Sequence, residues 1–64
     1  MKEGTVKFFN KSKGFGFITD SETNEEIFVH MSGLRDNIND DDKVRFTTQM
    51  GKKGMNAVDV EVIR

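Results

Sequence analysis

The chain has 64 residues, of which 34% are hydrophobic and 33% are charged, and its formal net charge is −1. A chain of this length supports one small domain with a single core, which we expect to span residues 1–64. The balanced charge argues against a general polycation, and no apolar run approaches the roughly 20 residues that cross a bilayer, so we expect no membrane segment.

The absence of cysteine excludes a disulfide framework and a thiolate zinc site. The first residues lead straight into a strand pattern without an apolar signal region, so we do not expect secretion through a cleaved peptide. There is one histidine, and no Ser, His and Asp spacing suited to catalysis is compatible with the predicted strands. We therefore expect a protein that is not an enzyme and that uses no cofactor.

The first half of the chain predicts a three-stranded meander. Strands are expected over residues 2–10, 15–20 and 26–30, where aromatic and β-branched residues gather between polar turns. A polar turn that ends at Gly14 separates the first two strands, and a polar hairpin loop over residues 21–25 separates the second from the third.

The second half predicts two further strands and no convincing helix. A short helical turn over residues 31–34 precedes a polar stretch, residues 35–42, whose one apolar residue is Ile38. Strands are expected over residues 43–50 and 55–63, with a flexible turn between them. The last strand has the clearest alternation, because its valines are separated by single acidic residues.

These strands predict an all-β fold, a five-stranded antiparallel barrel of the OB type. Closure is favoured because an open sheet of short strands would leave long edges and one unburied face. An SH3-like barrel is the alternative architecture. The inward positions supply the expected core, which consists of Val6, Ile18, Ile27, Val29, Leu34, Val44, Phe46, Val58, Val60 and Val62.

Flat side chains share the other face of the second and third strands. Phe15 and Phe17 are two residues apart and lie on one face of a strand, and Phe28 and His30 do so on the next. A stripe of phenylalanines is by default the inside of a barrel. However, the chain already has a full core and is too short to build a second layer, so we expect this face to be exposed and to bind a ligand.

Nucleobases are the ligand that this face suits best. Each base has a π face, and stacking on an aromatic side chain contributes about 1–3 kcal/mol per base. Lys7 and Lys13 lie near the edge of the patch and are expected to follow the phosphates. A module that binds a peptide or a partner domain through the same face is the alternative function.

Acidic residues concentrate in two predicted loops, around residues 20–26 and 36–42, and are interpreted as solvated faces. The adjacent residues Asp40, Asp41 and Asp42 lack the spaced ligands of a calcium loop. We therefore expect no metal site.

Three segments resemble the nucleic-acid-binding motifs of the bacterial and archaeal cold-shock proteins in order and spacing. They are Lys7-Phe8-Phe9-Asn10, Lys13-Gly14-Phe15-Gly16-Phe17-Ile18 and Phe28-Val29-His30. The similarity covers essentially the whole chain, including the turn at residues 51–54. It implies an OB-fold barrel that binds single-stranded RNA and DNA with little sequence selectivity, as an RNA chaperone or a cold-shock regulator of gene expression in the cytoplasm. Nothing in the sequence requires more than a monomer.

The resemblance and the strand parity together predict the site. Phe15, Phe17 and Phe28 are expected to stack on bases, and His30 to stack or to donate a hydrogen bond. Asn56 is expected either to bind a base or to hold a turn. The full predicted set is Lys7, Phe8, Asn10, Lys13, Phe15, Phe17, Phe28, His30, Met31, Lys52, Lys53 and Asn56.

Two details of this site have competing interpretations. Simple alternation places Phe8 on the core side, whereas the family pattern places it on the binding face, which requires a bend or bulge in the first strand. We follow the family pattern, so Phe9 is expected in the core. Gly14 and Gly16 are either tolerated strand glycines or positions that let bases approach the backbone.

The chain also departs from the family pattern. Family members usually have tryptophan at the position of Phe8, a further aromatic at the position of Met31, and a longer loop with another aromatic around residues 35–38. We expect the smaller platform to bind more weakly or to cover fewer nucleotides.

Overall fold

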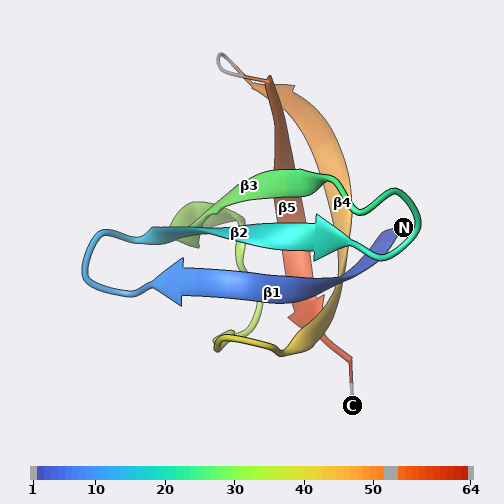
Figure 1. The fold of residues 1–64 in the computed structure, drawn as a ribbon. Helices are drawn as coiled ribbons and strands as arrows, with labels where there is room; N and C mark the ends of the chain where they lie inside the picture. The colour runs from blue at the N-terminus through green and yellow to red at the C-terminus, as the bar shows by residue number, and fades with distance from the viewer. Residues whose placement is uncertain (1, 52–53, 64) are drawn as a thin grey trace.

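A computed structural model, which describes residues 2–51 and 54–63, contains all of the predicted strands (Figure 1). They are β1 (Lys2–Asn10), β2 (Phe15–Asp20), β3 (Glu26–His30), β4 (Lys43–Gly51) and β5 (Gly54–Val62). The predicted helical turn is a 3₁₀ turn, η1 (Met31–Gly33), which follows β3 directly. Compared with the prediction, β4 ends one residue later, β5 begins and ends one residue earlier, and the helical turn ends one residue earlier.

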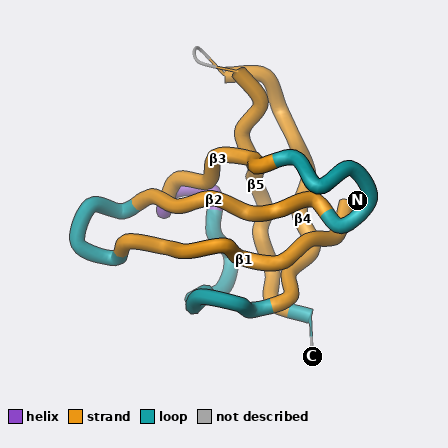
Figure 2. Tube along the Cα trace, viewed as in Figure 1, coloured by secondary structure: helices purple, strands orange, loops and turns teal. Residues whose placement is uncertain are grey.

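The strands close into a barrel in the order β1-β2-β3-β5-β4 (Figure 2). The predicted OB-type barrel is therefore confirmed. Four of the pairings are antiparallel, whereas β3 and β5 pair in parallel over two residues each. The parallel seam arises because β5 returns from the β4–β5 hairpin in the same direction as β3.

The core lies inside the barrel, and its first layer is a cross-strand row on the three-stranded meander. Val6 pairs with Ile18, and Ile18 pairs with Ile27. The first two side chains are fully buried and Ile27 is 7% exposed, which agrees with the predicted inward parity. The whole buried set is Val6, Ile18, Ile27, Val29, Ile38, Val44, Phe46, Ala57 and Val60.

The prediction for β5 is wrong in one respect. Val58 is half-buried rather than part of the core, and Ala57 takes the inward position. The alternation breaks because Asp59 adopts a left-handed backbone, φ 54°, and the register with β4 shifts between Arg45 and Thr47. Leu34 and Val62, also predicted core residues, are partly buried and pack against the core.

The core also includes a residue that the prediction left out. Ile38 is 1% exposed although it lies in the polar stretch between η1 and β4. Its burial places this stretch against the barrel, close to the end of β1.

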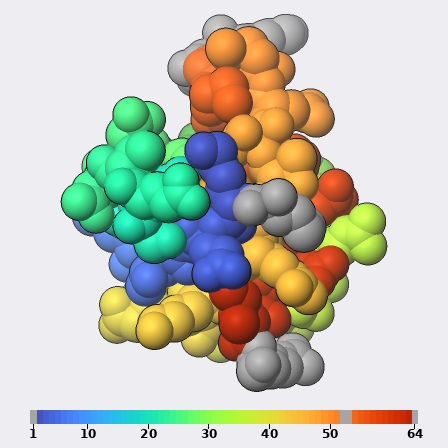
Figure 3. Space-filling view, turned by 90° about the vertical axis from the view of Figure 1, so that its right-hand side faces the viewer, coloured from blue at the N-terminus to red at the C-terminus, as the bar shows by residue number. Residues whose placement is uncertain are grey.

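The β4–β5 hairpin extends beyond the barrel (Figure 1) and forms a projection at the top of the space-filling view (Figure 3). Met50 and Met55 pair near its tip and are 72% and 44% exposed. Lys52 and Lys53, which were predicted to supply positive charge to the nucleic-acid site, lie outside the described residues.

Candidate nucleic-acid interface

Phenylalanine rings form one cross-strand row on the outer face of β1, β2 and β3. Strand pairing places Phe8 opposite Phe17, and Phe17 opposite Phe28. The ring centroids in these two pairs are 5.7 and 5.9 Å apart. Phe15 stacks on Phe28, with centroids 5.9 Å apart and 24° between the ring planes. These four rings, Phe8, Phe15, Phe17 and Phe28, are called the Phe platform below.

The platform lies on the outside of the barrel because its residues alternate with buried ones. Val6, Ile18 and Val29 are fully buried on the same strands, whereas three of the platform rings are half-buried and Phe8 is 36% exposed. The rings are therefore held at the sides by their neighbours while their outer surfaces stay accessible. This is the placement that the sequence predicted.

A bulge in β1 explains the direction of Phe8. The register between β1 and β2 shifts between Val6 and Phe8, so that Lys7 is the extra residue. Beyond the bulge, Phe8 points outward, and Phe9 is partly buried against the core. The predicted bulge and the predicted inward position of Phe9 are both confirmed.

His30 ends the platform at the 3₁₀ turn. It pairs with Phe15 across β2 and β3, and its Nδ1 accepts a hydrogen bond from the Ser32 N–H at 3.2 Å, as a cap of η1. The Ser32 hydroxyl lies 2.9 Å from the same nitrogen. With Nδ1 occupied in this way, the Nε2 side of the ring is the side left to contact a ligand.

Met31 lies next to His30 and is 59% exposed. Its sulfur lies 2.7 Å from the point where a side chain on Gly14 would begin, and Gly14 has φ 77°. The left-handed backbone therefore favours glycine here, whereas the flexible and exposed Met31 side chain could move away from an added Cβ.

Gly16 is required by packing. It is buried, and an added Cβ would lie 2.3 Å from the Phe8 carbonyl oxygen and 2.7 Å from the Phe9 Cα. The interpretation that these two glycines let bases approach the backbone is therefore wrong, because both face protein atoms. Gly16 instead lets β1 and β2 approach at the bulge.

The two lysines predicted at the edge of the platform differ in their surroundings. Lys7 forms an ion pair with Glu26 on β3. Lys13 lies exposed in the β1–β2 turn and makes no ion pair with the described residues.

The two predicted asparagines also differ. The side-chain oxygen of Asn10 accepts a hydrogen bond from the Lys13 N–H at 3.1 Å, so this side chain closes the β1–β2 turn. Asn56 lies beside Phe28 in the parallel seam and is half-buried, which places it at the margin of the platform.

Comparison with known proteins places this geometry in a family. Residues 2–63 match the profile of the 'Cold-shock' DNA-binding domain. The chain is 42% identical to the major cold shock protein of Micrococcus luteus over 94% of this chain and 96% of that protein. It is 43% identical to the cold shock-like protein CspC of Escherichia coli strain K12 over 95% of this chain and 94% of that protein.

This chain belongs to the cold-shock family. The family consists of nucleic-acid-binding proteins rather than enzymes. A solved Drosophila Unr chain superposes with a TM-score of 0.79 and covers 98% of this chain at 23% identity. This cold-shock chain spans 26% of the Unr chain, and the likeness shows the shared barrel fold.

Next to the platform, this cold-shock barrel has an open groove of about 580 Å³ that the sequence did not predict. Met31, which follows His30 in the chain, is one of its lining residues. The sequence signal for the groove was Ile38, a lone apolar residue in a polar stretch. The lining residues are Phe9, Lys11, Met31, Leu34, Arg35, Asp36, Asn37 and Ile38.

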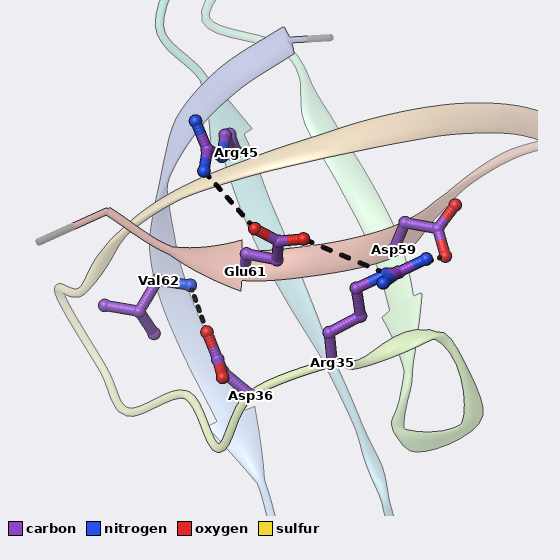
Figure 4. Close-up of polar contacts among 6 residues, drawn as sticks. All are labelled: Arg35, Asp36, Arg45, Asp59, Glu61 and Val62. Atoms are coloured by element: carbon purple, nitrogen blue, oxygen red, sulfur yellow. Dashed lines mark hydrogen bonds and ion pairs between the residues drawn. The ribbon is translucent and has the colours of Figure 1, made fainter.

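Away from the Phe platform, paired charges cover β4 and β5 of the cold-shock barrel (Figure 4). Arg35 lies 3.2 Å from Asp59 and 3.9 Å from Glu61. Arg45 lies 3.4 Å from the other oxygen of Glu61. Asp36 accepts a hydrogen bond from the Val62 N–H at 3.1 Å. Because these charges are matched within the chain, this surface offers little net attraction to phosphate.

The acidic run before β4 is mostly exposed, as the sequence predicted, and it also forms hydrogen bonds with the chain around it. Asp40 accepts a hydrogen bond from the Phe9 N–H at 3.0 Å. Asp41 has φ 69°, and its N–H donates to the Val6 carbonyl at 2.8 Å. Asp42 accepts from the Asn39 N–H at 2.9 Å. Residues of this run therefore form the hydrogen bonds to the edge of β1 beyond Thr5, where the pairing of β1 with β4 ends.

Within residues 2–51 and 54–63, no three His, Cys, Asp or Glu side chains are grouped so that they could hold a metal ion. The same part of the chain contains no helix long and apolar enough to cross a membrane.

Proposed function

We propose that this protein binds single-stranded RNA and DNA with little sequence selectivity, by stacking bases on the Phe platform. The observation that carries the proposal is the position of the platform. Its rings are in contact with one another on the outside of a barrel that already has a complete core. Solvent-exposed rings of this kind are unfavourable unless a ligand covers them, and stacking accepts every base because every base has a π face.

The surrounding groups support a single-stranded ligand. His30 extends the stacking surface, Asn56 offers hydrogen bonds at its margin, and Lys13 supplies a cation that the described residues do not neutralise. A duplex would keep its base faces covered by their own stacking, so these rings favour unpaired bases. The match to the 'Cold-shock' DNA-binding domain supports nucleic acid as the class of ligand.

We further propose that the protein acts in the cytoplasm as a monomeric RNA chaperone or regulator of gene expression. An RNA chaperone must bind many different sequences, and stacking on the platform does not depend on the identity of the base. The chain has Phe8 in the platform, and Met31 next to His30, where the family pattern has larger aromatic side chains. It therefore offers less π surface per base, and weaker binding than that of fuller members follows.

A titration of fluorescein-labelled oligothymidine, followed by fluorescence anisotropy, tests the proposal. Phe17 lies at the centre of the row, between Phe8 and Phe28, so Phe17→Ala should weaken binding by about 5- to 100-fold. Phe17→Leu keeps an apolar side chain without a π face and should also bind weakly. Ile63→Ala, which removes an exposed apolar side chain just after the end of β5, is the matched control and should bind like the wild type.

Salt dependence separates this function from peptide binding by the same face. Affinity for the oligonucleotide should fall as salt rises, with a slope of about −0.7 for each phosphate contact. Unchanged affinity in both Phe17 variants, with thermal melts showing that they are folded, would contradict the platform. A salt-independent interaction that an excess of oligonucleotide cannot displace would favour the peptide-binding alternative.

A further inference from the structure

The ion pair between Lys7 and Glu26 lies at one end of the Phe platform. On the outer face, Thr5, Thr19 and Glu26 form the cross-strand row that follows the row of rings. Lys7 is the extra residue of the β1 bulge, and its ammonium group reaches across β2 to the Glu26 carboxylate on β3. The pair therefore lies across the path of a strand that leaves the platform at this end.

Both partners of the pair are open to solvent. The side chain of Lys7 is 55% exposed and that of Glu26 is 47% exposed. Exposed ion pairs contribute about 0–1 kcal/mol, so an incoming anion can replace the carboxylate at low cost. Phosphate and carboxylate are both oxygen anions that accept hydrogen bonds from an ammonium group.

We propose that Glu26 competes with the phosphates of a bound strand for Lys7, and so limits the affinity and the salt dependence of nucleic-acid binding. This inference rests on the function proposed above. In the free protein Lys7 is neutralised by Glu26. On binding, Lys7 either stays paired and contributes little, or turns to a phosphate and leaves the Glu26 carboxylate unpaired beside the strand.

Lys13 provides an internal comparison. It is the second candidate phosphate contact, it lies exposed in the β1–β2 turn, and it has no carboxylate partner among the described residues. Removing its charge should therefore weaken binding more than removing the charge of Lys7. Competition between Glu26 and phosphate for Lys7 thus predicts a larger loss of affinity at Lys13 than at Lys7, although both lysines are exposed.

The central experiment measures oligothymidine binding by Glu26→Gln at about 50 mM salt and over a salt series. Glu26→Gln removes the competing carboxylate at nearly constant size. Affinity should rise about two- to fivefold, the factor that corresponds to one exposed ion pair. The slope of log K against log salt should become steeper by about 0.7, because Lys7 then adds one phosphate contact.

Two further variants separate competition for Lys7 from a general change in charge. Glu25→Gln changes the net charge by the same amount one residue away, and it should have a much smaller effect. In Lys7→Gln, the further change Glu26→Gln should no longer raise affinity.

The outcomes are distinguishable from a failure of the proposed function. If the wild type does not bind oligothymidine at all, the proposed function fails. If the wild type binds and Glu26→Gln leaves affinity and salt slope unchanged, or if Glu25→Gln raises affinity equally, the competition is overturned. A gain that persists in the Lys7→Gln background also overturns it.

Discussion

At the scale of single residues, Asp20 is the one polar or charged residue that is buried among the described residues, with 2% of its surface exposed. Its Oδ1 accepts hydrogen bonds from the backbone N–H groups of Glu22 at 2.7 Å and Thr23 at 3.3 Å. Lys2 lies 3.5 Å from the other carboxylate oxygen. The Glu22 hydrogen bond holds the pKa of Asp20 below its ordinary value of 3.8, although burial acts in the opposite direction.

This lowered pKa predicts a contribution to acid unfolding. The unfolded chain binds the Asp20 proton at a higher pH than the folded chain does, so the stabilisation is complete above about pH 5 and is lost as the pH falls below about 4. Asp20→Asn should therefore lower the Tm clearly near neutral pH and much less at about pH 2. Thermal melts of both proteins over a pH series, followed by circular dichroism, measure this difference.

Glu22→Gln is the matched control because it removes an exposed carboxylate from the same loop. It should leave the Tm almost unchanged at each pH. A Tm loss in Asp20→Asn that is the same at every pH would show that the charge of Asp20 is not the source of its stabilisation.

At the scale of elements, the bulge in β1 decides which rings belong to the platform. Pairing with β4 ends at Thr5, and the backbone beyond it is held by the loop before β4. Asp40 contributes the last of these contacts, by accepting the Phe9 N–H at 3.0 Å. It therefore helps to keep Phe9 turned toward the core and Phe8 toward the platform.

Asp40→Ala should loosen this part of β1. We expect a loss of about 0.5–1.5 kcal/mol in the free energy of unfolding, the typical net contribution of one hydrogen bond. Affinity for oligothymidine should fall as well, because Phe8 is no longer held in place. Urea unfolding and the anisotropy titration measure the two effects.

Asp40→Asn separates the hydrogen bond from the charge, because its side-chain oxygen can still accept from the Phe9 N–H. It should retain most of the stability and affinity. In a Phe8→Ala background, Asp40→Ala should have little further effect on binding. A full additional loss in that background would mean that Asp40 does not act through Phe8.

At the scale of the whole molecule, stability depends on one small core to which a loop contributes. Ile38 is 1% exposed and completes the core from outside the strands. Domains of this size bury only about 60% of the surface of the unfolded chain. Each buried side chain therefore accounts for a large share of the buried surface that stabilises the fold.

Ile38→Ala should therefore lower the free energy of unfolding by about 2–4 kcal/mol, and Ile38→Val by about 0.5–1.5 kcal/mol. Urea unfolding monitored by circular dichroism measures both. Asn37→Ala, a substitution at the exposed neighbouring position, should cost little. Similar stability in all three variants would show that the loop does not contribute to the core.

The fold and most of the platform were predictable because strand parity is a local property of the chain. Two-residue alternation places Phe15 and Phe17 on one face and buries Ile18 on the other, whichever strands lie beside them. The outward direction of Phe8 came from the family resemblance, since alternation alone placed it inside. At Asp59 the same local rule failed, because a left-handed residue in β5 reverses the parity that the valines suggested.

By itself, the sequence determined the five strands, the barrel class, the family and the side of the sheet that carries the rings. The tertiary structure alone decided which charges are paired, which loop residue is buried and what holds the bulge. These features join residues far apart in the chain: 19 positions separate Lys7 from Glu26, and 31 separate Phe9 from Asp40. Their partners are set by barrel closure, which brings strand ends and loops together in a way that no local pattern records.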